Sequence, residues 1–482
     1  MVLNRGSIFK ITGALSMIYS LTLILPALIS MLFHDGELWD FVISLAIFLG
    51  GGFFLYSLGS KHKLALHRRD GFIIVVLFWI MLSAMGTVPF LFALNISFVD
   101  AFFESASGLT TTGATVLSNL DSMPESILFY RQQLQWLGGM GLIVLAVAVL
   151  PVLGIGGMSI YRAESPGPMK EERMTPRLAK TARYLWSLYI SITLLCALAY
   201  WWVGMTPFDA VAHSMSTVST GGFSTHDASL AFYDSKAVEV VAMIFMLAGA
   251  INFSVHYLVW RRYNPLSYLR DIEVRSFLII VMMLILFTAV SLHLSGFYES
   301  IPHALRESAF EVISVITSTG FGLDDFSVWP LFLPALLILS SFIGGCGGST
   351  AGGMKVMRLL VLLKFGHREM KMLMHPHGLF QIKLGRQKLD SRVLRGISGF
   401  FAIYILTFVF LMLMLMATGV DQISAFSGIA TCINNLGPGL GEVAYSFSTI
   451  NDAGKLISVA AMLLGRLEIM SVMVLLHPAF WK

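Results

Sequence analysis

Four short apolar segments of the chain carry a glycine at the same position. They are 100–114 (DAFFESASGLTTTGA), 209–223 (DAVAHSMSTVSTGGF), 307–321 (ESAFEVISVITSTGF) and 424–438 (SAFSGIATCINNLGP), and the glycine stands 13 residues after the first residue of each. Gly113, Gly222, Gly320 and Gly437 are separated by 109, 98 and 117 residues, so one unit of about a hundred residues recurs four times. In membrane transporters such internal repeats commonly mark the substrate path.

The runs before the first three glycines offer a dense set of oxygen atoms. When a run of this kind faces a pore, its carbonyl and hydroxyl oxygens replace the hydration shell of a monovalent cation. Glycine permits the backbone torsions that the run requires. The pattern predicts cation ligands at Thr111, Thr112, Gly113, Thr220, Gly221, Gly222, Ser318, Thr319 and Gly320.

The charges around these segments also favour a cation over an anion. A short helix pointing inward directs its partly negative C-terminal end at the pore centre. Asp100, Asp209 and Glu307 are expected at the outer, N-terminal ends of three such helices. Four further carboxylates are expected to form a cation-attracting vestibule outside the membrane: Asp121, Asp227, Asp324 and Asp325.

Close helix packing is the alternative explanation for clusters of Ser, Thr and Gly in a membrane protein. That explanation suits a single TTTG motif well. Four occurrences at one offset, each after a stretch too short to cross a bilayer, favour the ion path instead.

The elements that must position these segments are membrane-spanning helices. Hydrophobic residues make up 56% of the 482-residue chain and charged residues only 12%, which lies outside the range of soluble domains. A helix of about 20 apolar residues crosses the hydrocarbon core of a bilayer. Ten spans are expected, of which 329–365 is broken in its middle: 11–33, 39–59, 71–94, 134–158, 184–204, 237–260, 276–296, 329–365, 396–418 and 455–476.

The repeated segments are only about half as long as a span. Eleven helical residues rise about 16 Å, so each short helix must enter from outside, stop near the middle and return as extended chain. Such irregular backbone survives at membrane depth only where protein buries it or water contacts it. The sequence therefore predicts an all-α polytopic membrane protein of about ten transmembrane helices, with four pseudo-symmetric helix–pore loop–helix repeats around a central ion pore.

The distribution of basic residues predicts the orientation. The loops 1–10, 60–70, 159–183, 261–275 and 364–395, with the final lysine, carry 25 of the 32 Lys and Arg residues. This bias places both termini in the cytoplasm and explains the net charge of +4 without a nucleic-acid partner. The twelve histidines and three cysteines show no metal-ligand spacing, and no metal site or organic cofactor is expected.

Two features indicate a gate. Six glycines in ten residues cannot form a stable helix, and they break the span at Gly344, Gly345, Gly347, Gly348, Gly352 and Gly353. A phosphate-binding loop fails there, because Met354 stands before Lys355 and no strand precedes the run. Helix packing remains an alternative for some of these glycines. Arg466 is expected near the centre of an unbroken last span, facing the ion path or a structural ion-pair partner.

With these motifs the chain resembles the Trk/Ktr/HKT superfamily of potassium transporters, most closely its bacterial TrkH subunits. The resemblance covers about residues 70–480, and the extra N-terminal helix pair also matches. It implies one filter glycine per repeat, an intramembrane gating loop at 344–353 and an arginine facing the ion path at Arg466. Gly113 argues for potassium, because plant relatives with Ser there permeate sodium. The fourth repeat departs most from the pattern, and the resemblance assigns Asn435, Leu436 and Gly437 to its filter.

The resemblance further implies K⁺ as the transported ion, a bacterial inner (plasma) membrane, a homodimer and a cytoplasmic nucleotide-binding partner of TrkA type. That partner would dock on basic inner loops such as 367–395. The chain itself shows no nucleotide site. The expected units are the helix pair 1–60, pore repeats at 61–158, 159–262 and 263–370 (the third containing the broken helix), and a fourth at 371–482.

Three rival functions remain. An intramembrane enzyme is disfavoured, because Gly320–Asp324 places its Asp one residue late for GxGD and no span carries the paired catalytic groups. A secondary carrier for an organic solute would need one midplane site with selective side chains rather than four repeated backbone turns. Within the ion-path interpretation, a sodium-permeable or poorly selective transporter of the same fold is the main alternative.

Overall fold

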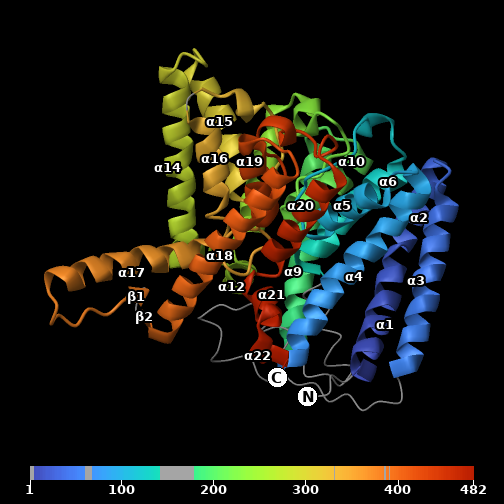
Figure 1. Ribbon diagram of the computed structural model, residues 1–482. Helices are drawn as coiled ribbons and strands as arrows, with labels where there is room; N and C mark the ends of the chain where they lie inside the picture. The colour runs from blue at the N-terminus through green and yellow to red at the C-terminus, as the bar shows by residue number, and fades with distance from the viewer. Residues whose placement is uncertain are drawn as a thin grey trace.

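The computed structural model describes residues 5–59, 68–141, 178–330, 332–384, 387–389 and 391–481. Figure 1 shows tall helices standing side by side, with shorter helices tilted between them. Six helices in these ranges are long and apolar enough to cross a bilayer. They comprise α1 (Arg5–Thr22) continued by α2 (Ile24–Phe33), and α3 (Leu38–Gly59), α4 (Arg68–Leu94), α9 (Leu178–Trp202), α14 (Ile272–Leu294) and α18 (Ser391–Ala417).

Two of the expected spans are bent pairs, and the prediction of continuous helices was wrong there. The pairs are α11 (Lys236–Ala250) with α12 (Phe253–Arg262), bent by 100°, and α20 (Asp452–Arg466) with α21 (Met470–Leu476), bent by 111°. The span expected at 329–365 is broken between α16 (Leu333–Ser341) and α17 (Val356–Met374), as predicted. The span expected at 134–158 begins in α6 (Glu125–Trp136) and a π-helical turn (Leu137–Gly141), and the rest lies outside the described residues.

Four shorter helices precede the repeated glycines and pack inside the bundle. They are α5 (Phe98–Leu109), α10 (Pro207–Ser219), α15 (Ile301–Ile316) and α19 (Gln422–Asn434). Most of their residues are buried, whereas the long helices expose many apolar side chains, as lipid-facing helices do. They are therefore half-length helices enclosed by protein, although at 12 to 16 residues they exceed the expected eleven.

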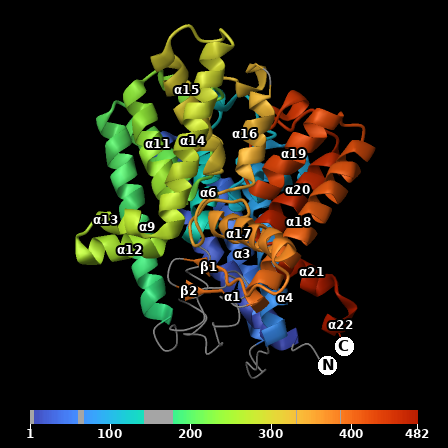
Figure 2. The ribbon, with the colours of Figure 1, turned by 90° about the vertical axis from the view of Figure 1, so that its left-hand side faces the viewer.

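The remaining elements are short. They are α13 (Leu266–Arg270), α22 (Pro478–Trp481) and a hairpin of β1 (Lys383–Leu384) and β2 (Gln387–Lys388), paired antiparallel. Single 3₁₀ turns follow each repeated segment at Leu120–Ser122, Ser229–Tyr233, Phe326–Val328 and Gly441–Val443. In the two views of the ribbon, α1 begins and α22 ends at the same end of the molecule (Figures 1 and 2).

Candidate ion-path site

Local capping fixes where three of the four half-length helices begin. The Ser97 hydroxyl accepts a hydrogen bond from the Asp100 amide, and Thr206 does the same for Asp209 at 3.1 Å. Asp421 caps α19 by accepting from the Ser424 amide. Asp100 and Asp209 thus lie in the first turn, where a carboxylate suits the helix dipole. Glu307 was wrongly expected at such an end, because α15 begins six residues earlier, at Ile301.

All four half-length helices end in the same turn. The residue two before each glycine has a left-handed conformation, with φ of 55° at Thr111, 53° at Thr220, 54° at Ser318 and 53° at Asn435. The next amide donates to a carbonyl five residues earlier in each case, for example Thr112 to Ser107 at 2.9 Å and Leu436 to Thr431 at 2.8 Å. This is the Schellman pattern, which usually places glycine at the left-handed position.

Threonine in that conformation is unusual and costs about 1–2 kcal/mol relative to the right-handed region. Thr111, Thr220 and Ser318 adopt this strained conformation at one register of three repeats, and Asn435, which tolerates it, adopts it in the fourth, which indicates a functional constraint on the backbone. The repeated glycines follow, with φ of 80° at Gly113, 81° at Gly222, 81° at Gly320 and 105° at Gly437.

The four turns close into a ring in chain order. A β-carbon added at Gly113 would overlap the Gly221 carbonyl oxygen, one at Gly222 that of Thr319, and one at Gly320 that of Leu436. A β-carbon at Gly437 would come within 2.8 Å of the Thr112 carbonyl oxygen, which returns the contact to the first repeat. Each glycine is therefore packed against the carbonyl that precedes the next repeat's glycine. The structure brings together all twelve residues expected there from sequence.

The side-chain oxygens of this ring are largely occupied by other groups. The Thr112 hydroxyl bonds with that of Thr110 at 2.7 Å, and the Thr319 hydroxyl with that of Thr317 at 2.8 Å. Asn435 Nδ2 donates to Thr112 Oγ1, which joins the fourth repeat to the first. The backbone carbonyls are therefore better candidates for ion ligands than the hydroxyl groups, which the sequence also offered as ligands.

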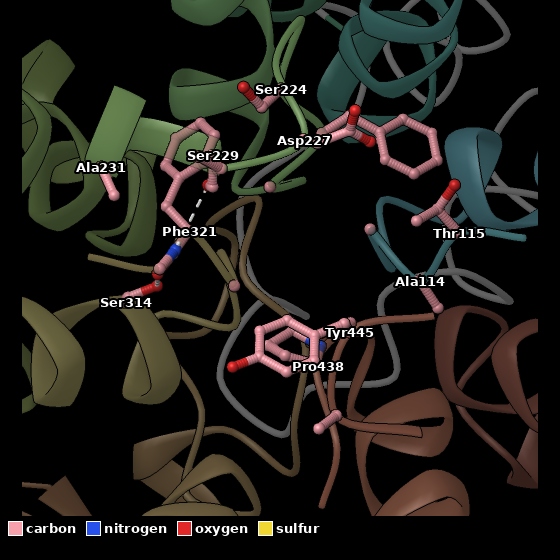
Figure 3. Close-up of a pocket in the computed structure, with 18 of the residues that line it drawn as sticks. Ala114, Thr115, Ser224, Asp227, Ser229, Ala231, Ser314, Phe321, Pro438 and Tyr445 are labelled. Atoms are coloured by element: carbon pink, nitrogen blue, oxygen red, sulfur yellow. Dashed lines mark hydrogen bonds between the residues drawn. The ribbon is translucent and has the colours of Figure 1, made fainter. Parts of the chain in front are cut away.

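A cavity of about 430 Å³ lies directly outside the ring and is lined by all four glycines. Figure 3 shows residues from all four repeats around its opening, including Ala114, Ser224, Phe321 and Pro438. Its lining includes Asp227, Asp324, Asp325 and Glu311 beside His226 and Arg131. Because Arg131 is already paired with Glu104, the acidic groups outnumber the remaining basic ones and the cavity attracts cations. Asp121 is not among the lining residues; its carboxylate accepts hydrogen bonds from His226 and from the Asp227 amide.

The strand after each glycine is held by a buried group that sequence reasoning missed. Glu104 accepts from the Val116 amide at 3.1 Å, and Glu311 accepts from the Leu323 amide at 2.9 Å. His213 Nε2 bonds with Ser224 Oγ at 2.9 Å. The three ionisable residues each stand nine positions before their glycine, an offset that the repeat alignment already contained. In the fourth repeat Ser427 Oγ takes this role and accepts from the Leu440 amide.

One of these groups forms a fully buried ion pair. Arg131 Nε lies 2.7 Å from Glu104 Oε1, and the two side chains are 1% and 0% exposed. Arg131 also donates to the Ser224 carbonyl at 3.0 Å, and its guanidinium lies 4.2 Å from the centre of the Phe223 ring. The pair therefore joins the first two repeats directly behind the ring of glycines.

The glycine-rich segment lies against the ring on the side away from the cavity. The Gly352 amide donates to Ser318 Oγ at 2.6 Å, and a β-carbon at Gly352 would overlap the Asn434 carbonyl oxygen. Thr350 Oγ1 donates to the carbonyls of Val218 and Gly249, and Thr220 Oγ1 lies 3.3 Å from it. Residues 344–353 are thus non-helical and in contact with the second, third and fourth repeats.

Arg466 was wrongly expected near the centre of an unbroken span. It is the last residue of α20, directly before the 111° bend. Its guanidinium donates to the carbonyls of Thr350 at 3.0 Å, Gly138 at 2.6 Å and Gly139 at 2.5 Å. Glu468 pairs with Arg358 at 2.6 Å. Arg466 therefore joins the glycine-rich segment to the π-helical turn Leu137–Gly141.

The outer loops contain a pH-sensitive contact between His226 and Asp121. Burial alone lowers the pKa of His226, but the nearby Asp209 carboxylate and the hydrogen bond to the Asp121 carboxylate outweigh this and raise it above its ordinary value. The hydrogen bond from His226 lowers the pKa of Asp121. The contact between charged His226 and charged Asp121 stabilises the folded protein at pH values above the ordinary pKa of Asp121. This stabilisation is lost as the pH rises through the raised pKa of His226.

We therefore expect amide exchange at 224–229, corrected for intrinsic rates, to accelerate at alkaline pH. The effect should be worth less than about 1 kcal/mol, because Asp121 is half exposed. In the His226→Gln variant, the corrected exchange rate of these amides should not change with pH. An equally strong pH dependence in that variant would show that another group titrates.

Comparisons with known proteins agree with this architecture. A family described as "Cation transport protein", TrkH, matches residues 40–482. This chain belongs to the TrkH family. It is 50% identical over 480 residues to the Trk system potassium uptake protein TrkH of Vibrio parahaemolyticus, covering 99% of each chain. It is 47% identical over 478 residues to the protein of the same name from Escherichia coli K12, again covering 99% of each.

A solved structure supports the fold independently. The crystal structure of the potassium transporter TrkH from Vibrio parahaemolyticus superimposes with a TM-score of 0.90 at 48% identity, covering 99% of both chains. The resemblance drawn from the repeated motifs is confirmed, and so is the class of polytopic helical membrane protein. These relatives are named as transport proteins, which agrees with the expectation that the TrkH-family chain is not an enzyme.

Proposed function

We propose that this TrkH-family chain takes up potassium ions across the bacterial plasma membrane. The ions pass through the ring of Gly113, Gly222, Gly320 and Gly437, where backbone carbonyls replace their hydration water. The observation that carries this proposal is the closed ring of four turns, each with a left-handed residue two positions before its glycine, beneath an acidic cavity. The names of the relatives, which are potassium uptake proteins, support the choice of ion.

The experiment that tests this function is rubidium uptake into proteoliposomes that contain only this protein. Uptake should be blocked by K⁺ and barely affected by Na⁺ or Li⁺. Equal competition by Na⁺ would still support an ion pore, but it would favour a poorly selective transporter of the same fold. A blank result is repeated with the cytoplasmic partner, and a second blank would contradict the ion-path function.

The orientation and assembly form part of the proposal. Both termini lie in the cytoplasm, in accord with the positive-inside distribution of Lys and Arg. Two chains form a homodimer with one pore each, and a nucleotide-binding subunit of TrkA type docks on the basic inner loops, including 367–395. The division into a helix pair and four pore repeats follows the boundaries given above.

The segment 344–353 acts in this proposal as the gate, with Gly344, Gly345, Gly347, Gly348, Gly352 and Gly353 allowing it to move. Arg466 holds it closed through the Thr350 carbonyl and adds positive charge below the filter. Removing residues 347–349 should raise rubidium uptake in the absence of the partner. The matched control is Gly399→Ala, outside the segment, whose β-carbon would meet no atom within 4 Å. Uptake at the intact level in the shortened variant would assign the segment to packing.

A further inference from the structure

One buried side chain from outside the four turns contacts a carbonyl of the ring. Gln135 lies next to the end of α6, the helix that follows the first turn, and its side chain is completely buried. Its Nε2 donates to the Gly221 carbonyl at 2.6 Å. This is the same carbonyl against which Gly113 packs. Because α6 and α10 lie side by side (Figure 1), Gln135 reaches from the first repeat into the second.

The orientation of the Gln135 amide is fixed by its other partners. Its Oε1 accepts from Ser216 Oγ at 2.7 Å and from the Phe223 amide at 3.1 Å. A flipped amide would place Oε1 against the Gly221 carbonyl and Nε2 against the Phe223 amide, so only the observed orientation satisfies both. Gln135 therefore binds the returning strand on both sides of the ring glycine Gly222.

Gly221 makes room for this side chain. The equivalent residues of the other repeats are Thr112, Thr319 and Leu436, all of which carry side chains. The φ of Gly221, unlike that of Gly222, is not positive, so the backbone conformation does not require glycine here. A β-carbon at Gly221 would overlap the amide group of Gln135. The close approach of Gln135 thus explains why this position has no side chain.

The contact occurs in the second repeat only, as far as the structure describes the chain. Among the described residues, no side chain donates to the corresponding carbonyls of Thr112, Thr319 and Leu436. A carbonyl oxygen has two lone pairs, so that of Gly221 can accept from Gln135 and still offer one to an ion. The amide of Gln135 is neutral and adds no full positive charge next to the ion path. It can therefore restrain a ligand without competing with the ion.

We propose that Gln135 is a positioning residue for ion selectivity, which holds the Gly221 carbonyl at the spacing that suits potassium. The inference rests on the proposed function, because it requires ions to bind at the ring carbonyls. Na⁺ is smaller than K⁺, so carbonyls replace its hydration shell well only when they move closer together. The hydrogen bond from Gln135 restrains the Gly221 carbonyl against this movement.

Rubidium uptake by Gln135→Met in proteoliposomes, competed in parallel with K⁺ and Na⁺, tests the inference. The variant should still take up rubidium, but its preference for K⁺ over Na⁺ should fall about three- to tenfold, the range that one neutral hydrogen bond corresponds to. The matched control is Gln133→Met in the same helix. Gln133 is also buried, but its Nε2 donates to the Thr22 carbonyl at 2.7 Å, in the N-terminal helix pair.

The control separates selectivity from stability. Both variants lose a buried hydrogen bond, so both should unfold at a lower temperature than the unaltered protein. Only Gln135→Met should lose preference for K⁺. An unchanged preference in Gln135→Met, or equal losses in both variants, would overturn the inference.

Gly221→Ala approaches the same contact from the other side and serves if Gln135→Met does not fold. The nearest atoms to its β-carbon all belong to Gln135, so the substitution displaces the amide from the strand. Its preference for K⁺ should fall as in Gln135→Met, and an unaltered preference would overturn the inference. Failure of the proposed function is recognised separately, because the unaltered protein itself would then take up no rubidium or show equal competition by Na⁺.

Discussion

Gly113→Ser is expected to admit sodium and to reduce the preference for potassium by an order of magnitude or more. A β-carbon at this position would overlap the Gly221 carbonyl oxygen, and the φ of 80° already disfavours any residue but glycine. The neighbouring turn must move, and the spacing of the carbonyls around the ion changes with it. The measurement is rubidium uptake by the variant in proteoliposomes, competed in parallel with K⁺ and Na⁺.

Gly322→Ala is the matched control for this substitution. Gly322 lies two residues after a ring glycine and also lines the outer cavity, but a β-carbon there would meet no atom within 4 Å. The control should keep the selectivity of the unaltered protein. An unchanged K⁺/Na⁺ ratio in Gly113→Ser would remove Gly113 from the filter.

Glu104→Gln is expected to destabilise the protein by about 3–5 kcal/mol, because it leaves the buried Arg131 without its counter-charge. Both side chains are almost completely shielded from water, so solvent cannot compensate for the lost carboxylate. The packing of the first two repeats beside the ring of glycines should weaken as well, because Arg131 donates a hydrogen bond to the Ser224 carbonyl of the second repeat. Thermal unfolding of the purified protein followed by tryptophan fluorescence measures the loss.

Glu311→Gln provides the comparison for the buried pair. Glu311 occupies the equivalent position in the third repeat but accepts from the amides of Leu323 and Asp324 instead of facing an arginine. Glu311→Gln should therefore lower the stability of the protein clearly less than Glu104→Gln does. The double variant Glu104→Gln/Arg131→Gln should recover part of the single loss, because no charge then remains buried alone. Equal melting temperatures for Glu104→Gln and the unaltered protein would contradict this account of the pair.

The sequence was informative wherever a local pattern repeats. The glycine at a constant offset after a short apolar segment predicted nine residues that the structure brings into one ring, and the family resemblance added the three of the fourth repeat. Asp100 and Asp209 were expected at the outer ends of two short helices, and they lie in the first turns of α5 and α10. The break at 344–353 was also visible, because glycine-rich chain cannot remain helical.

The bends of two spans were not visible, because distant contacts cause them. The carbonyls of Ala250 and Gly249 at the end of α11 accept hydrogen bonds from the amides of Cys346 and Thr350, about a hundred residues later. At the other bend, a β-carbon on Gly465 would overlap the Ile433 carbonyl oxygen, so α19 and α20 touch through backbone. From hydropathy alone, residues 455–476 were predicted to form one continuous span. Arg466 was therefore expected at the centre of that span, whereas it lies at the bend.

The buried acids behind the ring were overlooked for a related reason. Glu104 and Glu311 stand within apolar segments, and their partners are backbone amides of the returning strand. A sequence gives the offset of these residues but not the direction of their side chains. The partner of Glu104, Arg131, comes 27 residues later, in the next helix.

Crystals of the protein soaked in a rubidium salt test the central claim most directly. Anomalous diffraction should place rubidium on the axis of the ring, within coordination distance of backbone carbonyls from all four repeats, and an excess of K⁺ should remove the peak while Na⁺ leaves it. An ordered ring of Gly113, Gly222, Gly320 and Gly437 without bound rubidium, in a protein that still takes up rubidium, would contradict the assignment of the filter to these turns.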